Sequence, residues 1–118
     1  MNNIDESDSF MLACERRSEQ SIQRARVAFQ ELLHLAETRD SGQIRRIAEF
    51  IAATYNGDIY CFDLFELRCL DVKISDHILV CLDCLRWGGS DLYRLAPDGD
   101  ARVRAVIARW DLKQTTKN

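Results

Sequence analysis

The sequence predicts an all-α fold: a single-domain helical bundle of about four main helices with one or two short ones. Its 118 residues are 47% hydrophobic and include 5 glycines and 1 proline, so helix breakers are few. A chain of this length can bury a core without metal or disulfide support. Apolar residues also recur at helical spacing in several segments. We expect residues 10–112 to form the domain, with flexible ends at 1–9 and 113–118.

The first predicted helix covers residues 22–39, where apolar residues follow the i, i+3, i+4 pattern. The preceding stretch, 14–21, is polar on nearly all sides. We expect it to be a solvated helix or a frayed arm.

The stretch 40–57 predicts a complete helix, which we expect to be the spine of the core. Asp40 is the expected N-cap, with Gln43 three residues later at capping-box spacing. Asn56-Gly57 is expected to supply a left-handed residue that ends the helix. The apolar stripe between these ends consists of Ile44, Ile47, Ala48, Ile51 and Tyr55.

The segment 58–62 is apolar but short, and a single strand would have no sheet to join, so we expect a connector there. Asp63 begins a capping-box spacing that predicts a short helix to about residue 68. The next helix, 72–87, is apolar on so many sides that we expect it to be the most buried. Asp100 is expected to cap the last helix, whose inward residues are Val103, Val106, Ile107 and Trp110.

The bulk charge and hydropathy exclude several classes of protein. The net charge is −3, which argues against broad binding to phosphate backbones. No segment approaches the ~20 apolar residues of a membrane span, and the polar, acidic N-terminus does not resemble a signal peptide. We therefore expect a cytoplasmic protein with reduced cysteines. These are Cys14, Cys61, Cys69, Cys81 and Cys84.

One group of residues has metal-ligand spacing. His77, Cys81 and Cys84 stand at i, i+4 and i+7, on one helical face. Structural zinc sites usually combine two tight ligand pairs, whereas here one pair lies inside an apolar helix. We expect these cysteines to pack in the core. No metal or other cofactor is predicted, and a zinc module remains the alternative.

Catalytic patterns are weak. His34 and His77 are the two histidines, and the carboxylates form no spaced pair with an evident task. Gly88-Gly89 is better explained as a helix stop than as a phosphate-binding loop. We expect a protein that is not an enzyme.

Two predicted helices around the short turn at Gly42 also match the outline of a helix-turn-helix. In that arrangement Gln43, Arg45 and Arg46 would meet base edges and phosphates. Helical hairpins are common in bundles and the chain is acidic overall, so direct nucleic-acid binding is the alternative. We favour a surface that faces a protein partner.

The segment from residue 42 resembles an uncharacterised domain family of proteobacterial mobile genetic elements, found on integrated conjugative elements, plasmids and phages. Its G-Q-x-R-R-x-A-x-F signature and aromatic–Asn end correspond to Gly42, Gln43, Arg45, Arg46, Ala48, Phe50, Tyr55 and Asn56. The resemblance extends over about residues 28–110. Further matches are Phe62-Asp63-Leu64, Leu70, Asp71, Ile74, Asp76 and the helix 103–110.

The chain departs from the family pattern in three places. Thr54-Tyr55 stands where the family usually has a tryptophan, Arg68 replaces an aromatic residue, and the cysteines are not part of the pattern.

The residue patterns favour non-enzymatic protein binding, and the resemblance implies an accessory protein of a mobile genetic element that acts in a bacterial host cell. The sharper hypothesis is an inhibitor of a host defence complex, of the anti-CRISPR type, that binds protein subunits of a nucleoprotein assembly. The alternative is a small helix-turn-helix-like DNA-binding regulator. The expected partner-binding residues are Gln43, Arg45, Arg46, Glu49, Asp63 and Asp76.

Overall fold

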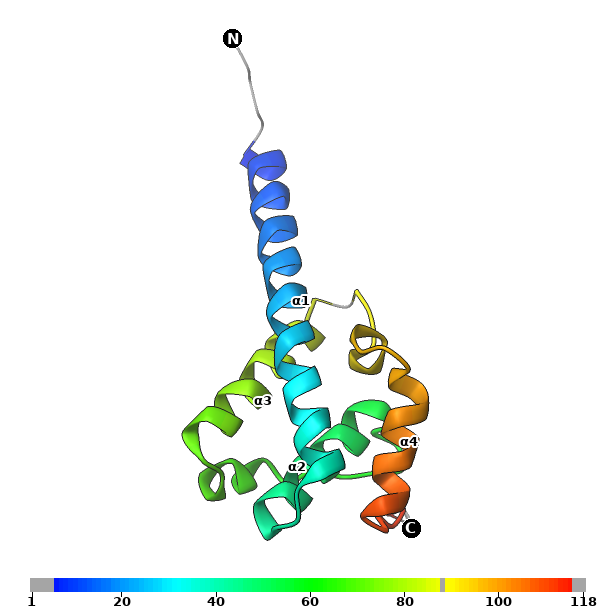
Figure 1. Ribbon diagram of the computed structural model, residues 1–118. Helices are drawn as coiled ribbons and strands as arrows, with labels where there is room; N and C mark the ends of the chain where they lie inside the picture. The colour runs from blue at the N-terminus through cyan, green and yellow to red at the C-terminus, as the bar shows by residue number, and fades with distance from the viewer. Residues whose placement is uncertain (1–5, 88, 116–118) are drawn as a thin grey trace.

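The computed structural model describes residues 6–87 and 89–115 (Figure 1). Within these residues it confirms the all-α prediction, with four α-helices, two short 3-10 helices and no strand. The elements in chain order are α1 (Glu6–Thr38), α2 (Gly42–Tyr55), η1 (Leu64–Cys69), α3 (Val72–Leu85), η2 (Leu92–Leu95) and α4 (Gly99–Arg109). Of the predicted flexible ends, residues 6–9 belong to α1 and 113–115 are described, whereas 1–5 and 116–118 lie outside the described residues.

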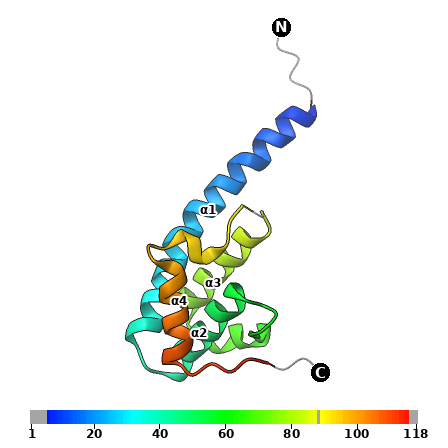
Figure 2. The same ribbon diagram turned by 90° about the vertical axis from the view of Figure 1, so that its right-hand side faces the viewer.

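The molecule is elongated because α1 extends well beyond the rest of the bundle. The radius of gyration is 16.6 Å, against about 13 Å for a compact chain of this length. Residues 6–20, which we call the arm, project away from the body in both side views (Figures 1 and 2). Sequence periodicity predicted a helix from residue 22 and left 14–21 as a solvated helix or a frayed arm. The helix is continuous from Glu6, so 14–21 is a solvated part of it apart from the buried Ser21.

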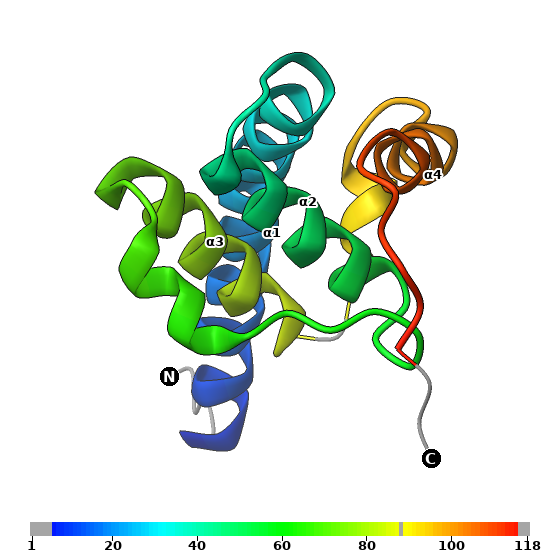
Figure 3. The ribbon, with the colours of Figure 1, turned by 90° about the horizontal axis from the view of Figure 1, so that it is seen from below.

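The remainder of α1 is the centre of the core. It packs against α2, α3, α4 and η2, and in the view from below α3 lies to one side of it and α4 to the other, with α2 between them (Figure 3). Its residues Ala25, Phe29, Leu32, Leu33 and Ala36 are fully buried. The core was expected to be built on α2 and α3. Both contribute buried residues, but α1 is its centre, because α1 packs against α2, α3, α4 and η2.

Both predicted ends of α2 differ from the observed ones. Ser41 is the N-cap, and its hydroxyl accepts a hydrogen bond from the Ile44 N–H at 3.3 Å. Asp40, one residue earlier, instead pairs with Arg109 at 2.7 Å. Asn56 is extended, with φ −149°, rather than left-handed. The predicted Asp40 cap was wrong, because α2 begins one residue later than the capping pattern implied. The predicted left-handed stop was wrong as well, because the backbone of Asn56 is extended.

α3 lies at the edge of the bundle. Its buried residues are confined to one side: Ile74, Ile78, Cys81 and Cys84. Val72 is 75% exposed and Leu79 is 53% exposed on the outward side. The prediction that this helix is the most buried was wrong, because its outward apolar residues were taken for core.

α4 begins at a tight turn rather than at the predicted Asp100 cap. Asp98 occupies the N-cap position with a left-handed φ of 52° and makes no side-chain capping bond. A Cβ atom at Gly99 would lie 1.7 Å from the Tyr93 carbonyl oxygen, so the turn requires glycine there. Asp100 instead accepts a hydrogen bond from the Tyr55 hydroxyl at 2.6 Å.

The C-terminal end of α1 is closed by side chains from the end of α4. The Arg109 guanidinium donates to the carbonyl oxygens of Ala36 and Arg39 at 2.9 and 3.1 Å. The Trp110 indole N–H also donates to the Ala36 carbonyl, at 2.8 Å. These bonds satisfy carbonyl groups that a helix end leaves without partners.

None of the helices in the described residues combines the length and the apolar character needed to cross a membrane.

Candidate functional site

Three polar residues of the α2 signature were predicted to contact a partner, and each contacts another element of the same domain. The first is Gln43. Its side-chain amide donates to an Asp71 carboxylate oxygen at 3.2 Å, and its carbonyl oxygen accepts from the Asp71 backbone N–H. Because Asp71 precedes α3, Gln43 joins the first turn of α2 to the start of α3.

Arg45 joins α2 to the chain beyond α4. Its guanidinium Nη1 donates to the Trp110 carbonyl oxygen at 3.0 Å, and its Nε lies 3.4 Å from a Glu49 carboxylate oxygen. Burial raises the pKa of the Glu49 carboxyl, and the nearby charge of Glu66 adds to the rise, while the adjacent arginines oppose it.

Arg46 joins α2 to η1. Its Nε lies 2.7 Å from a Glu66 carboxylate oxygen, and the two side chains are 34% and 29% exposed. Such a half-buried pair is less screened by solvent than one on the surface. All three signature residues thus connect elements of the domain. Arg45 is exposed to solvent, whereas Gln43 and Arg46 are half-buried. Direct partner contacts by them remain a prediction.

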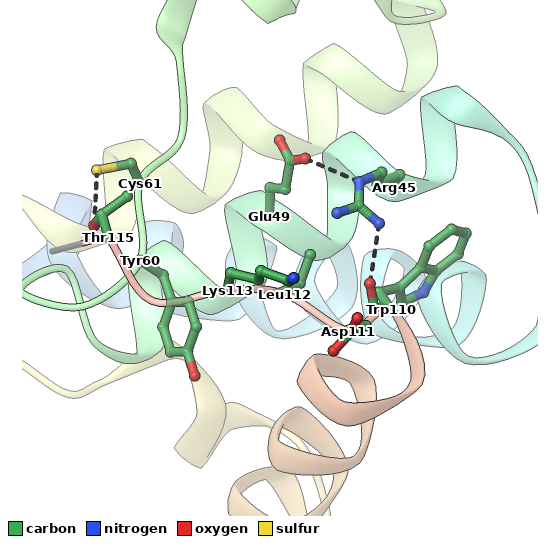
Figure 4. A pocket seen from close by; sticks show the side chains of 9 residues that line it. All are labelled: Arg45, Glu49, Tyr60, Cys61, Trp110, Asp111, Leu112, Lys113 and Thr115. Atoms are coloured by element: carbon green, nitrogen blue, oxygen red, sulfur yellow. Dashed lines mark hydrogen bonds and ion pairs between the residues drawn. The ribbon is translucent and has the colours of Figure 1, made fainter.

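A pocket of about 500 Å³ lies beside Arg45, between α2, the connector after α2 and the segment after α4 (Figure 4). Arg45 and Glu49 enter it from α2 and pair with each other, so their charges largely cancel. On its far side the Cys61 thiol lies 3.5 Å from the Thr115 hydroxyl. The Thr115 N–H also donates to the Ile59 carbonyl at 2.7 Å. The lining therefore fastens the C-terminal segment to the body.

A second region has a different character. Leu64, Phe65, Val72 and Leu79 are 63%, 68%, 75% and 53% exposed. They come from η1 and α3, which follow each other along the chain after a two-residue link. Single exposed apolar residues are ordinary, but several on adjoining elements indicate an interaction site. We call these four residues, with Asp63 and Asp76, the η1–α3 surface.

Two of the six predicted partner-binding residues lie on this surface. Asp76 is exposed and stands between Val72 and Leu79 on the outward side of α3. Asp63 is also exposed and caps η1, where its carboxylate accepts the Phe65 N–H at 2.9 Å. The Arg68 guanidinium lies 5.0 Å from the centre of the Phe65 ring.

Sequence reasoning missed the apolar members of the η1–α3 surface. A signal for two of them was present, because Val72 and Leu79 are seven residues apart and lie opposite Ile74 and Ile78 on a helical wheel. Two opposed apolar faces indicate that one of them is left for another contact.

The alternative metal ligands occupy different surroundings. Cys81 and Cys84 are buried in the core, and burial raises the pKa of the Cys81 thiol to about 12. A thiol held protonated is a poor metal ligand, since zinc binds the thiolate. The His77 Nε2 atom is buried. Among residues 6–87 and 89–115, no group of three His, Cys, Asp or Glu side chains is placed to hold a metal ion.

Comparisons with known proteins give a family but no activity. No curated protein and no solved structure matches the chain. A family model matches residues 26–111. The matched region begins after the arm and includes α2, η1, α3 and α4. The chain therefore belongs to a family of unknown function (DUF7673).

Proposed function

We propose that this protein is a non-enzymatic binding protein that attaches to a protein partner through the η1–α3 surface. The observation that carries the proposal is the exposure of four large apolar side chains on two consecutive elements. Complete burial of such a side chain contributes roughly 1.5–3 kcal/mol. A partner that covered all four would gain enough to offset part of the cost of association.

The charges on the surface indicate what kind of partner fits. Asp63 and Asp76 are exposed beside the apolar residues. A complementary partner has an apolar recess for Phe65 and Val72, with lysine or arginine residues that meet the two carboxylates.

A finer proposal is an accessory protein of a mobile genetic element that inhibits a host defence complex, in the manner of an anti-CRISPR protein. It is supported by the signature at residues 42–50, which resembles that of a family from mobile elements. Subunits that hold nucleic acid present basic side chains, which suits a binding surface with exposed carboxylates.

The alternative, a helix-turn-helix-like DNA-binding regulator, draws less support from the geometry. To reach base edges, Gln43 and Arg46 would have to leave Asp71 and Glu66. The geometry favours a protein partner, and DNA binding is kept as the second outcome of the test.

The test is a pull-down of the tagged chain from a bacterial host, followed by affinity measurement with the captured protein. We expect Val72→Asp and Leu79→Asp to weaken that complex at least about tenfold, as hot-spot substitutions do. Leu12→Asp introduces the same charge at an exposed leucine of the arm and serves as the matched control. Equal binding by all three variants would contradict the proposed surface.

The same preparations distinguish the DNA-binding alternative. Duplex DNA binding that falls with salt and is lost in Arg45→Ala/Arg46→Ala would favour a regulator. If Arg45 and Arg46 act only within the domain, the folded double variant retains the protein complex, whereas loss of the complex would support their predicted contacts with the partner.

A further inference from the structure

The arm continues the buried stripe of α1 into solvent. Ser21, Ala25, Ala28 and Leu32 are buried along one side of the helix. Counting back from Ser21 by three and four residues gives Arg17, Cys14 and Phe10 on the same side. They belong to the arm, which projects from the body (Figure 2), and Arg17 lies at the base of the arm.

The two ends of this stripe carry opposite charges. Glu6 lies one turn before Phe10 and contributes negative charge to the first turn of α1. Arg17 lies two turns after Phe10, and its guanidinium is 5.4 Å from the centre of the Trp87 ring at the base of the arm. Between the charged ends the stripe consists of Phe10, Ala13 and Cys14. Phe10 is 70% exposed, so the largest apolar side chain of the stripe faces water.

This order of residues is complementary to the same stripe of a second copy that runs in the opposite direction. When two arms lie antiparallel, with residue 6 of one opposite residue 17 of the other, Glu6 meets Arg17 at both ends of the pair. The same register places Phe10 of each helix against the small Ala13 and Cys14 of the other. A large residue then enters a space left by small ones, as in knobs-into-holes packing. In a parallel pair like charges would face each other and the two Phe10 rings would compete for one position.

We propose that two copies of the chain associate through their arms, as an antiparallel helix pair along Glu6, Phe10, Ala13, Cys14 and Arg17. The interface is isologous, with the same stripe contributed by each copy about a two-fold axis. Helical segments exposed on all sides are marginal in water, so each arm gains stability from the other. The arm is about 22 Å long at 1.5 Å per residue, which places the interface at the small end of specific interfaces. The association is therefore reversible and depends on concentration.

Sedimentation equilibrium from micromolar to millimolar concentration tests the pairing in the intact chain. We expect a monomer–dimer equilibrium that Phe10→Asp weakens at least about tenfold. Leu12→Asp is the matched control, because Leu12 is exposed on the same arm but points to the opposite side of the helix. We expect it to dimerise like the parent. A parent that stays monomeric throughout, or equal weakening by both variants, would overturn the proposal.

Charge reversal tests the antiparallel register. Glu6→Lys and Arg17→Glu each place like charges together and are expected to weaken the dimer several-fold. The two changes combined in one chain restore opposite charges in the antiparallel pair and return the affinity toward that of the parent. Additive weakening in the double variant would exclude this register. Arg26→Glu, the same reversal at an exposed α1 position outside the arm, is expected to have no effect. Circular dichroism on each variant checks that helix content is unchanged.

Discussion

α2 and α3 are helices of equal length, 14 residues each, with opposite surroundings. The outward polar residues of α2 are bonded to the start of α3, to η1 and to the segment after α4. The outward side of α3 instead exposes Val72 and Leu79 to solvent. The polar face therefore holds the domain together, while the apolar face is left open.

This contrast shows that a helix's apolar content does not determine its burial. Burial depends on how many neighbours the fold places around the helix. α2 lies between α1 and α4 and contacts η2 as well. α3 is covered chiefly by α1, so one of its two apolar faces has no cover among the described residues.

The largest effect expected from this contrast is on stability. Phe50 of α2 is buried and makes an edge-to-face contact with Phe62, with ring centres 5.4 Å apart. We expect Phe50→Ala to lower the free energy of unfolding by about 3–5 kcal/mol, because it leaves a cavity. Leu79→Ala, on the open face of α3, is expected to change it by less than about 0.5 kcal/mol. Urea denaturation measures both, and a large loss in Leu79→Ala would mean that α3 is covered after all.

A smaller effect concerns the ion pairs of the two helices. A double-mutant cycle on Arg46 and Glu66, which are about one-third exposed, is expected to give a coupling energy of about 1 kcal/mol. The matched pair on α3, Arg86 and Asp83, is 55% and 41% exposed. Its coupling is expected to be about 0.3 kcal/mol, since solvent screens it more. Equal couplings would remove the structural role assigned to Arg46.

The smallest effect is a dependence of stability on pH. It involves two carboxylates, one on α3 and one hydrogen-bonded to the end of α2. A hydrogen bond from Ser21 lowers the pKa of Asp83 on α3. A hydrogen bond from Tyr55, at the end of α2, lowers the pKa of Asp100. A pKa lowered by folding adds stability above the unfolded value of about 3.9, and this stability is lost as the pH falls through the folded value.

We therefore expect the free energy of unfolding to decrease as the pH falls below about 4. Ser21→Ala and Tyr55→Phe are expected to lower stability near neutral pH and to differ less from the parent in acid. Chemical denaturation at both pH values measures this difference. A gap between variant and parent that stays constant with pH would show that neither bond depends on the carboxylate charge.

The local structure was largely predictable from the sequence. The spacing of Ile74, Ile78 and Cys81 placed α3 within two residues of its observed end, and Asp63 marked the start of η1. These features depend on residues close together in the sequence, so apolar periodicity and capping patterns can predict them. Glycine and capping patterns were less reliable at the ends of α2, where Ser41 competed with Asp40 for the cap.

The tertiary partners were not predictable in the same way. Nothing in the sequence around Arg46 indicates that Glu66 lies beside it, because their contact depends on how the chain turns between them. The adjacent arginines suggested a partner surface for the same reason that the outward apolar residues of α3, such as Leu79, suggested core. A polar or apolar side chain indicates a preference for water or for burial. The packing of the elements decides whether that preference is met.

The closure of α1 by Arg109 and Trp110 has a consequence for how the protein is made. α1 emerges from the ribosome before α4, and the groups that satisfy its Ala36 carbonyl are synthesised more than 70 residues later. Until then the last turn of the central helix has no protein partner from α4. The native closure of α1 therefore forms only after α4 has been translated, however early α1 itself becomes helical.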